Sequence, residues 1–213
     1  MNSNIDPLTS LSELWEWCKQ NRESAWKFPE KDGVRGYLGS LPLCIVADSP
    51  GNRSRKHRQL ALPYSNDLDV FTSPWDRRFY ESLRKYGLEN AHLMHAHISE
   101  IPDWEQDRRL FLKQIELVKP EALLIMGTNR KKRWGVWRTV ARYLHGWQGA
   151  RPRMYSMFHY SDRFVSNVEW DRTFRAALIE IAANHPALAG ALRTLRMSEM
   201  RERNSPVDLR AAR

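Results

Sequence analysis

Hydrophobic residues form two patterns along the chain, and the first consists of short, unbroken apolar runs. Leu43–Ala47 and Ala122–Met126 are such runs, and each ends at residues typical of turns. Continuous apolar segments of this length predict strands that are buried on both faces of a sheet. Ala91–Ile98 and Met154–Phe158 predict two further strands, the last being the weakest of the four.

The second pattern is the three- and four-residue spacing of apolar positions, which indicates helices with one buried face. Ser10 with Glu13, and Ser166 with Glu169, have the form of capping boxes at helix starts, and Asp103 is a third cap. The predicted helices cover residues 11–28, 75–86, 104–119, 137–146 and 167–184.

Strands that alternate with helices require crossover connections, and these produce parallel strands covered by helices. The order therefore predicts a three-layer α/β/α sandwich with a central, mainly parallel four-stranded sheet. We expect a single domain over residues 1–184, followed over 185–213 by a short helix and a basic tail.

The charge balance indicates a polyanionic partner. The 213 residues include 34 Lys and Arg against 25 Asp and Glu, which gives a formal net charge of +9. Such an excess favours nucleic acid over a membrane surface, because binding phosphates releases their counterions. No apolar run approaches the roughly 20 residues of a membrane span, and the first ten residues do not resemble a secretory signal. We therefore expect a cytoplasmic protein.

Two cysteines, Cys18 and Cys44, are too few for a disulfide framework, a four-cysteine zinc site or an iron–sulfur cluster. We expect both to be buried thiols. His95 and His97 are two residues apart on a predicted strand and could bind a metal. Because no third ligand is evident, packing or contact with a base is favoured, and neither a metal nor a cofactor is expected.

Polar chemistry follows each predicted strand. Asp48 ends the first strand, His95 and His97 end the second, Gly127 ends the third and His159 follows the fourth. In a parallel sheet these ends meet at one edge, where ligands bind. Basic residues fall on the same loops, which favours a phosphate-binding face. These residues are Arg53, Arg55, Lys56, Arg58, Arg130, Lys131, Lys132 and Arg163.

An Asp and a His on opposite loops beside DNA suit cleavage of a glycosidic bond. A carboxylate can orient water and offset positive charge on the sugar, while an imidazole can hydrogen-bond the departing base. The base must first be flipped out of the duplex into a pocket.

Two motifs resemble those of the uracil-DNA glycosylase superfamily. Ala47–Gly51 is similar to the first motif, written G-E-A-P-G in one microbial branch and G-I-N-P-G in the mismatch-specific branch. The second motif, H-P-S, resembles residues 159–161, and residues 118–127 fit the helix and strand between the motifs. The resemblance covers residues 43–181.

The resemblance implies a role for each matching residue. Asp48 would position the attacking water, and His159 would donate to the base oxygen as the bond breaks. Phe71 would stack on the flipped base. The remaining matches would contact the base or hold the DNA strand. Ser49 and His95 belong to the base-binding group, and Pro50, Gly51, Ser161 and Arg163 belong to the DNA-binding group.

Departures from the motifs leave the substrate open. Ala47 replaces the first glycine, Tyr160 replaces the proline of H-P-S, and His95 stands where uracil-reading members carry an Asn. At Gly51 there is no aromatic side chain to block substituents at the pyrimidine 5-position. The expected activity is that of a monofunctional, monomeric DNA glycosylase acting on uracil or on a modified, even glucosylated, cytosine of phage DNA. The alternatives are a non-catalytic DNA-binding module and a hydrolase of free nucleotides.

Overall fold

The computed structural model describes residues 5–21, 41–48, 74–88, 90–97, 103–127, 135–159 and 165–192. Its strands are β1 (Leu43–Ala47), β2 (His92–His95), β3 (Ala122–Met126) and β4 (Arg153–Met157). Its helices are α1 (Leu11–Asn21), α3 (Pro74–Lys85), α4 (Trp104–Val118), α5 (Gly135–Tyr143), α6 (Asn167–Asn184) and α7 (Pro186–Ala191).

The four strands form one all-parallel sheet in the order β2-β1-β3-β4. The predicted α/β class, with a parallel four-stranded sheet, is confirmed. Strand boundaries differ from those predicted by a few residues at most: β2 is confined to His92–His95, and β4 begins one residue earlier, at Arg153. The chain turns to one side of β1 for β2 and then to the other side for β3.

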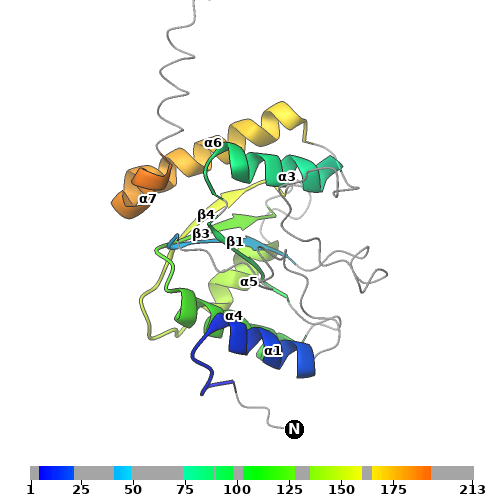
Figure 1. Cartoon of the computed structure of the whole chain (residues 1–213), viewed down its shortest axis with the longest axis vertical. Coiled ribbons are helices and arrows are strands. Elements are labelled where there is room, and N and C mark those ends of the chain that lie inside the picture. The colour runs from blue at the N-terminus through cyan, green and yellow to red at the C-terminus, as the bar shows by residue number, and fades with distance from the viewer. Residues whose placement is uncertain are drawn as a thin grey trace, which may run out of the picture.

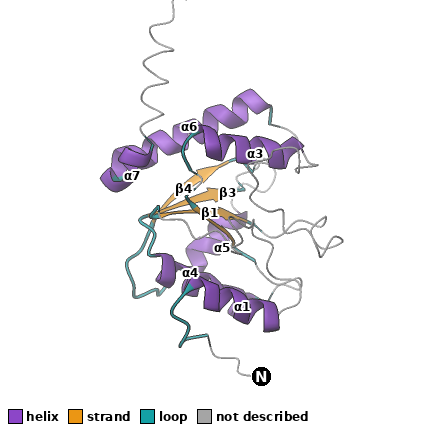
Figure 2. Cartoon of the chain, viewed as in Figure 1, coloured by secondary structure: helices purple, strands orange, loops and turns teal. Residues whose placement is uncertain are grey.

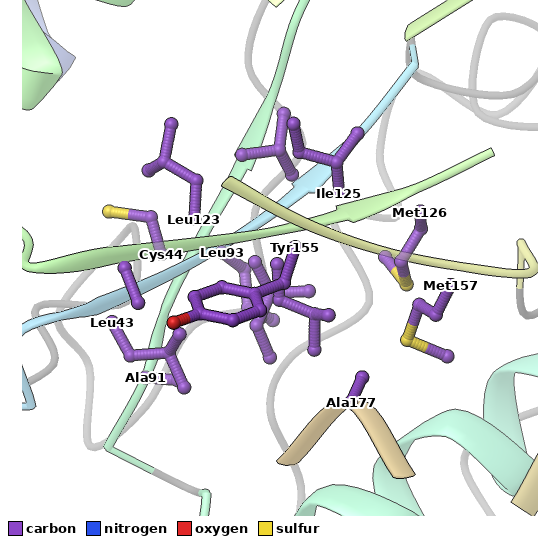
Figure 3. Packing of buried hydrophobic residues seen from close by; sticks show 14 of the residues in the cluster. Leu43, Cys44, Ala91, Leu93, Leu123, Ile125, Met126, Tyr155, Met157 and Ala177 are labelled. Atoms are coloured by element: carbon purple, nitrogen blue, oxygen red, sulfur yellow. The ribbon is translucent and has the colours of Figure 1, made fainter. Parts of the chain in front are cut away.

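Register assigns each strand residue to a face of the sheet. Ile45 lies beside Leu93 and Leu124, and Leu124 lies beside Tyr155. Since neighbours in a parallel sheet share a face, these four side chains form one apolar layer. Figure 3 shows Leu93 and Tyr155 on the same side as Ala177 of α6, with Leu123 and Ile125 on the other side.

Helices lie on both sides of the sheet. Figure 1 shows α3, α6 and α7 on one side and α1, α4 and α5 on the other, and Figure 2 separates the strands from the helices by colour. Side-chain contacts agree: the Tyr155 hydroxyl lies 3.0 Å from Nε2 of His185, which links α6 to α7. On the opposite face, Nε2 of His92 lies 3.2 Å from Oε1 of Gln114 in α4.

One large hydrophobic core joins the sheet to its helices. All five residues of β1 and all five of β3 are buried, as expected for central strands of a parallel sheet. Trp170 and Phe174 of α6 are fully buried against this core. A smaller cluster, formed by Ile5, Leu14, Cys18 and Leu110, fastens α1 to α4. Cys44 and Cys18 are buried free thiols, as predicted.

The predicted helix caps are present. At the start of α1, the Glu13 N–H donates to Oγ of Ser10 at 3.2 Å, and the Ser10 N–H donates to Oε2 of Glu13 at 3.2 Å. The Asp103 carboxylate accepts from the Gln106 N–H at 3.1 Å, and Ser166 caps α6. These bonds satisfy backbone donors that would otherwise lack partners. The helices within the described ranges fall short of the length and apolar character that a membrane crossing requires.

Gly127 ends β3 in a conformation that other residues rarely adopt. Its φ is 138°, and a Cβ at this position would lie 2.7 Å from Cγ2 of Val136 in α5. Val136 is buried and β-branched, so it has little freedom to move away. Glycine therefore lets α5 pack close to the carboxyl end of β3.

We predict that Gly127→Ala lowers the free energy of unfolding by about 1–3 kcal/mol, because it adds backbone strain and a steric clash. Urea denaturation followed by circular dichroism measures the loss. The control is Gly190→Ala in α7, where no atom lies within 4 Å of an added Cβ. This variant should be as stable as the wild type or slightly more stable. Equal stability of the two variants would show that Gly127 is not required.

Candidate functional site

The carboxyl ends of β1 and β3 form the topological switch point of the sheet. β1 and β3 are neighbours, but the chain leaves β1 toward β2 and leaves β3 toward β4. Connections that depart in opposite directions open a crevice between two adjacent strand ends, where ligands of open parallel sheets bind. Asp48 directly follows β1 and Gly127 directly follows β3, so the predicted catalytic aspartate lies at this point.

The backbone of Asp48 is tied to the next strand. The Ala96 N–H donates to the Ala47 carbonyl, and the His97 N–H donates to the Asp48 carbonyl, both at 2.8 Å. These bonds tie Ala47 and Asp48 to the two residues that directly follow β2. The Asp48 side chain remains 59% exposed, so a rigid backbone presents its carboxylate to solvent.

His97 lies between two carboxylates. Its Nε2 is 4.0 Å from Oδ1 of Asp48, and its Nδ1 is 3.4 Å from Oδ2 of Asp107 in α4. The Tyr143 hydroxyl of α5 also lies 3.4 Å from Nδ1. The residues that follow β1 and β2 therefore meet side chains of α4 and α5. We call the three charged members of this group the Asp48–His97–Asp107 row, and Tyr143 lies beside it.

Asp107 is the member that the sequence analysis missed. Its side chain has no exposed surface, which is rare for a carboxylate unless it has a charged or hydrogen-bonded partner. A signal was present, because Asp107 belongs to the helical series that continues with Phe111, Ile115 and Val118. A carboxylate on the buried face of an amphipathic helix indicates a partner inside the fold.

The row changes how easily His97 binds a proton. The hydrogen bond that His97 donates to the Asp107 carboxylate raises the pKa of His97 above its ordinary value, partial burial opposes this, and the charges of Asp48 and Asp107 raise it further. Burial raises the pKa of the Tyr143 hydroxyl, so this group stays protonated and neutral. The imidazole therefore holds its proton to higher pH than a free histidine.

An exposed aromatic and basic surface adjoins the row. The Trp104 ring packs on Tyr143 with centroids 4.6 Å apart, and the Arg142 guanidinium lies 4.8 Å from the Trp104 centroid. Trp104 is one of the few large apolar side chains left exposed among the described residues. The sequence pattern gave Trp104 only a place in a helix start, and gave Arg142 no role. An exposed indole beside a cation suits contact with nucleobases and phosphates.

His95 and His159 both lie at the carboxyl edge of the sheet and interact electrostatically. Burial lowers the pKa of His95 to about 4, and the charge of His159 lowers it further, so the two imidazoles lie within electrostatic range. The sequence predicted that His95 and His97 lie on the same strand and so on the same face of the sheet. In the structure β2 ends at His95, and His97 lies beyond the strand. Asp48 and Asp107 contact His97, while His159 interacts with His95.

The structure describes three of the predicted site residues: Asp48, His95 and His159. The predicted pairing of Asp48 with His159 across one base remains a prediction. The other predicted site residues lie outside the described residues; they are Ser49, Pro50, Gly51, Arg53, Arg55, Lys56, Arg58, Phe71, Arg130, Lys131, Lys132, Ser161 and Arg163. In the described part of the chain, no three His, Cys, Asp or Glu side chains are grouped so that they could hold a metal.

Comparison of the sequence with protein-family models and with curated proteins finds no match. The function of this chain is therefore inferred from its own residues and geometry.

We predict that His95 makes stability fall at acid pH. Its folded pKa of about 4 lies below the ordinary value of 6.5, so the unfolded chain binds a proton that the folded chain rejects. Stability is lost as pH falls from about 6.5 to 4, by up to about 3 kcal/mol. His95→Gln removes this contribution. Urea denaturation at several pH values should therefore show the wild type losing more stability than the variant.

The matched control is His145→Gln, because His145 is exposed at the end of α5. This variant should follow the pH dependence of the wild type. If His95→Gln also follows it, His95 is not a buried neutral imidazole.

Proposed function

We propose that the chain is a monofunctional DNA glycosylase, which flips a non-standard pyrimidine out of DNA and hydrolyses its N-glycosidic bond. The observation that carries the proposal is the position of Asp48, an exposed carboxylate at the switch point of a parallel sheet whose edge also carries His95, His97 and His159.

Bond cleavage leaves positive charge on the sugar, and the reaction needs a negative group and an oriented water on that side. The Asp48 carboxylate provides the charge and is exposed enough to meet both water and a sugar. In this proposal the water oxygen bonds to C1′, the bond from C1′ to the base nitrogen breaks, and its electron pair leaves with the base. Asp48 accepts the proton of the water.

His159 and His95 suit the opposite role, contact with the departing base. Their mutual repulsion and the burial of His95 keep at least His95 neutral at physiological pH. A neutral imidazole can donate one hydrogen bond and accept another, which matches the mixed donors and acceptors on a pyrimidine edge. The base is uracil or a modified cytosine. Because His95 replaces the asparagine typical of uracil recognition in the family that the chain resembles, the pocket need not be specific for uracil.

Three observations support DNA as the partner. The net charge is +9, basic residues follow the first and third strands in the sequence, and Trp104 with Arg142 forms a stacked surface next to the row. We propose that Ser49 and Phe71 contact the flipped base. Pro50, Gly51, Ser161 and the basic loops would contact the DNA backbone. The enzyme would act as a monomer in the cytoplasm, in DNA repair or in defence against phage.

The test is base release from synthetic duplexes that carry uracil, glucosylated hydroxymethylcytosine or unmodified cytosine at one position. The protein should produce abasic sites at one modified base, seen as strand breaks only after alkali. Neither motif contains a lysine to form a Schiff base, so breaks without alkali are not expected. We predict that Asp48→Asn reduces the rate by about 100-fold or more, because charge stabilisation and water positioning are lost.

Asp171→Asn is the control, since Asp171 binds Lys85 and Tyr86 between α6 and α3. It should keep full activity. Salt-sensitive DNA binding without any abasic site would favour a non-catalytic binding module, and turnover of monomers alone would favour a nucleotide hydrolase. Undiminished cleavage by Asp48→Asn would refute the proposed role of this carboxylate.

A further inference from the structure

We propose that His97 is a positioning residue. It is an imidazolium between two carboxylates: Asp107 anchors its ring, and the ring holds the Asp48 carboxylate in the position that orients the attacking water. This inference rests on the proposed function, in which Asp48 orients the water. It adds two residues, His97 and Asp107, that neither motif contains.

The geometry gives each ring nitrogen of His97 a separate task. Nδ1 faces the buried carboxylate of Asp107 at 3.4 Å, and Nε2 faces the exposed carboxylate of Asp48 at 4.0 Å. A buried acid that accepts from Nδ1 fixes the plane of the ring, and the second nitrogen then points in one direction. Here that direction is toward Asp48. A small side-chain movement would bring Nε2 and the Asp48 carboxylate within hydrogen-bond distance, or one water could bridge them.

A cation beside Asp48 is compatible with the negative charge that the reaction needs. Two carboxylates and one imidazolium sum to a net charge of −1, so the row remains negative where the sugar becomes positive. Without the imidazolium, the Asp48 side chain would have one fewer neighbour to limit its rotation, since it is largely exposed. The proton stays on His97 throughout the reaction, because Asp48 takes the proton that the attacking water releases.

The groups that face His97 come from three elements: Asp48 follows β1, Asp107 lies in α4 and Tyr143 in α5. Tyr143 is neutral because burial raises its pKa. Both charged neighbours are therefore negative, and both raise the pKa of His97. The imidazolium form is favoured up to the folded pKa and is lost as pH rises through it.

The experiment measures kcat for base release against pH. The proposal predicts that the rate falls on the alkaline side as His97 loses its proton. Asp107→Asn removes the largest contribution that raises the pKa of His97, so the alkaline limb should move to lower pH by about one unit. His97→Gln should remove this limb and lower kcat by about 10- to 100-fold, with KM changed far less.

His185→Gln is a matched control, because His185 also lies between a tyrosine hydroxyl and a carboxylate. Its Nε2 is 3.0 Å from the Tyr155 hydroxyl, and its Nδ1 is 3.3 Å from Glu121. This group is at the amino end of the sheet, away from the site, so the variant should keep the wild-type pH profile.

A second measurement, NMR titration of His97, needs no substrate. Its midpoint should fall in Asp107→Asn and, by less, in Asp48→Asn. An unchanged alkaline limb in an active, folded Asp107→Asn, or a titration midpoint that fails to fall, overturns the inference and leaves the glycosylase proposal intact. If Asp107→Asn does not fold, two other measurements test the inference: the pH profile of kcat for His97→Gln, and the NMR titration of His97 in Asp48→Asn. Failure of the wild type to release any base overturns the proposed function itself.

Discussion

The pairing of β1 with strands on both sides is the constraint on which the rest of the structure depends. β1 is buried along its whole length between β2 and β3, so its backbone has no freedom to shift without breaking two ladders. Asp48, the first polar residue after this strand, consequently emerges at a fixed point on the carboxyl edge. The two backbone bonds at 2.8 Å that follow the strand fix His97 relative to it. The same pairing that forms the core therefore determines which side chains meet at the edge.

Burial lowers the pKa of both histidines at this edge, and for His97 the neighbouring carboxylates reverse this effect. Both side chains are partly buried. His97 faces carboxylates, which favour its proton, while desolvation and the charge of His159 disfavour a proton on His95. His97 therefore favours the charged imidazolium, and His95 favours the neutral imidazole. Such a separation is the arrangement expected where one group stabilises charge and another contacts a neutral base.

The helices, the strands and their parallel arrangement could be predicted from the sequence, because apolar runs and helical spacing are local signals. Leu43–Ala47 and Ala122–Met126 were predicted with their observed bounds, since buried central strands must be continuously apolar. The position of Asp48 at the sheet edge followed from the same pattern. Asp107 was not predicted, because its partner is ten residues away on another element. Its place on the buried face of α4 was visible, but the contact depends on how α4 packs against β2.

In the proposed reaction, the Asp48 carboxylate takes part in releasing a free base from DNA. The most direct measurement is mass spectrometry of the small molecules released from phage DNAs whose cytosines carry different decorations. We expect one modified pyrimidine as the free base, in equal amount to the abasic sites formed, with none from Asp48→Asn. Release of nucleosides or nucleotides instead, or of nothing from any DNA, would contradict it.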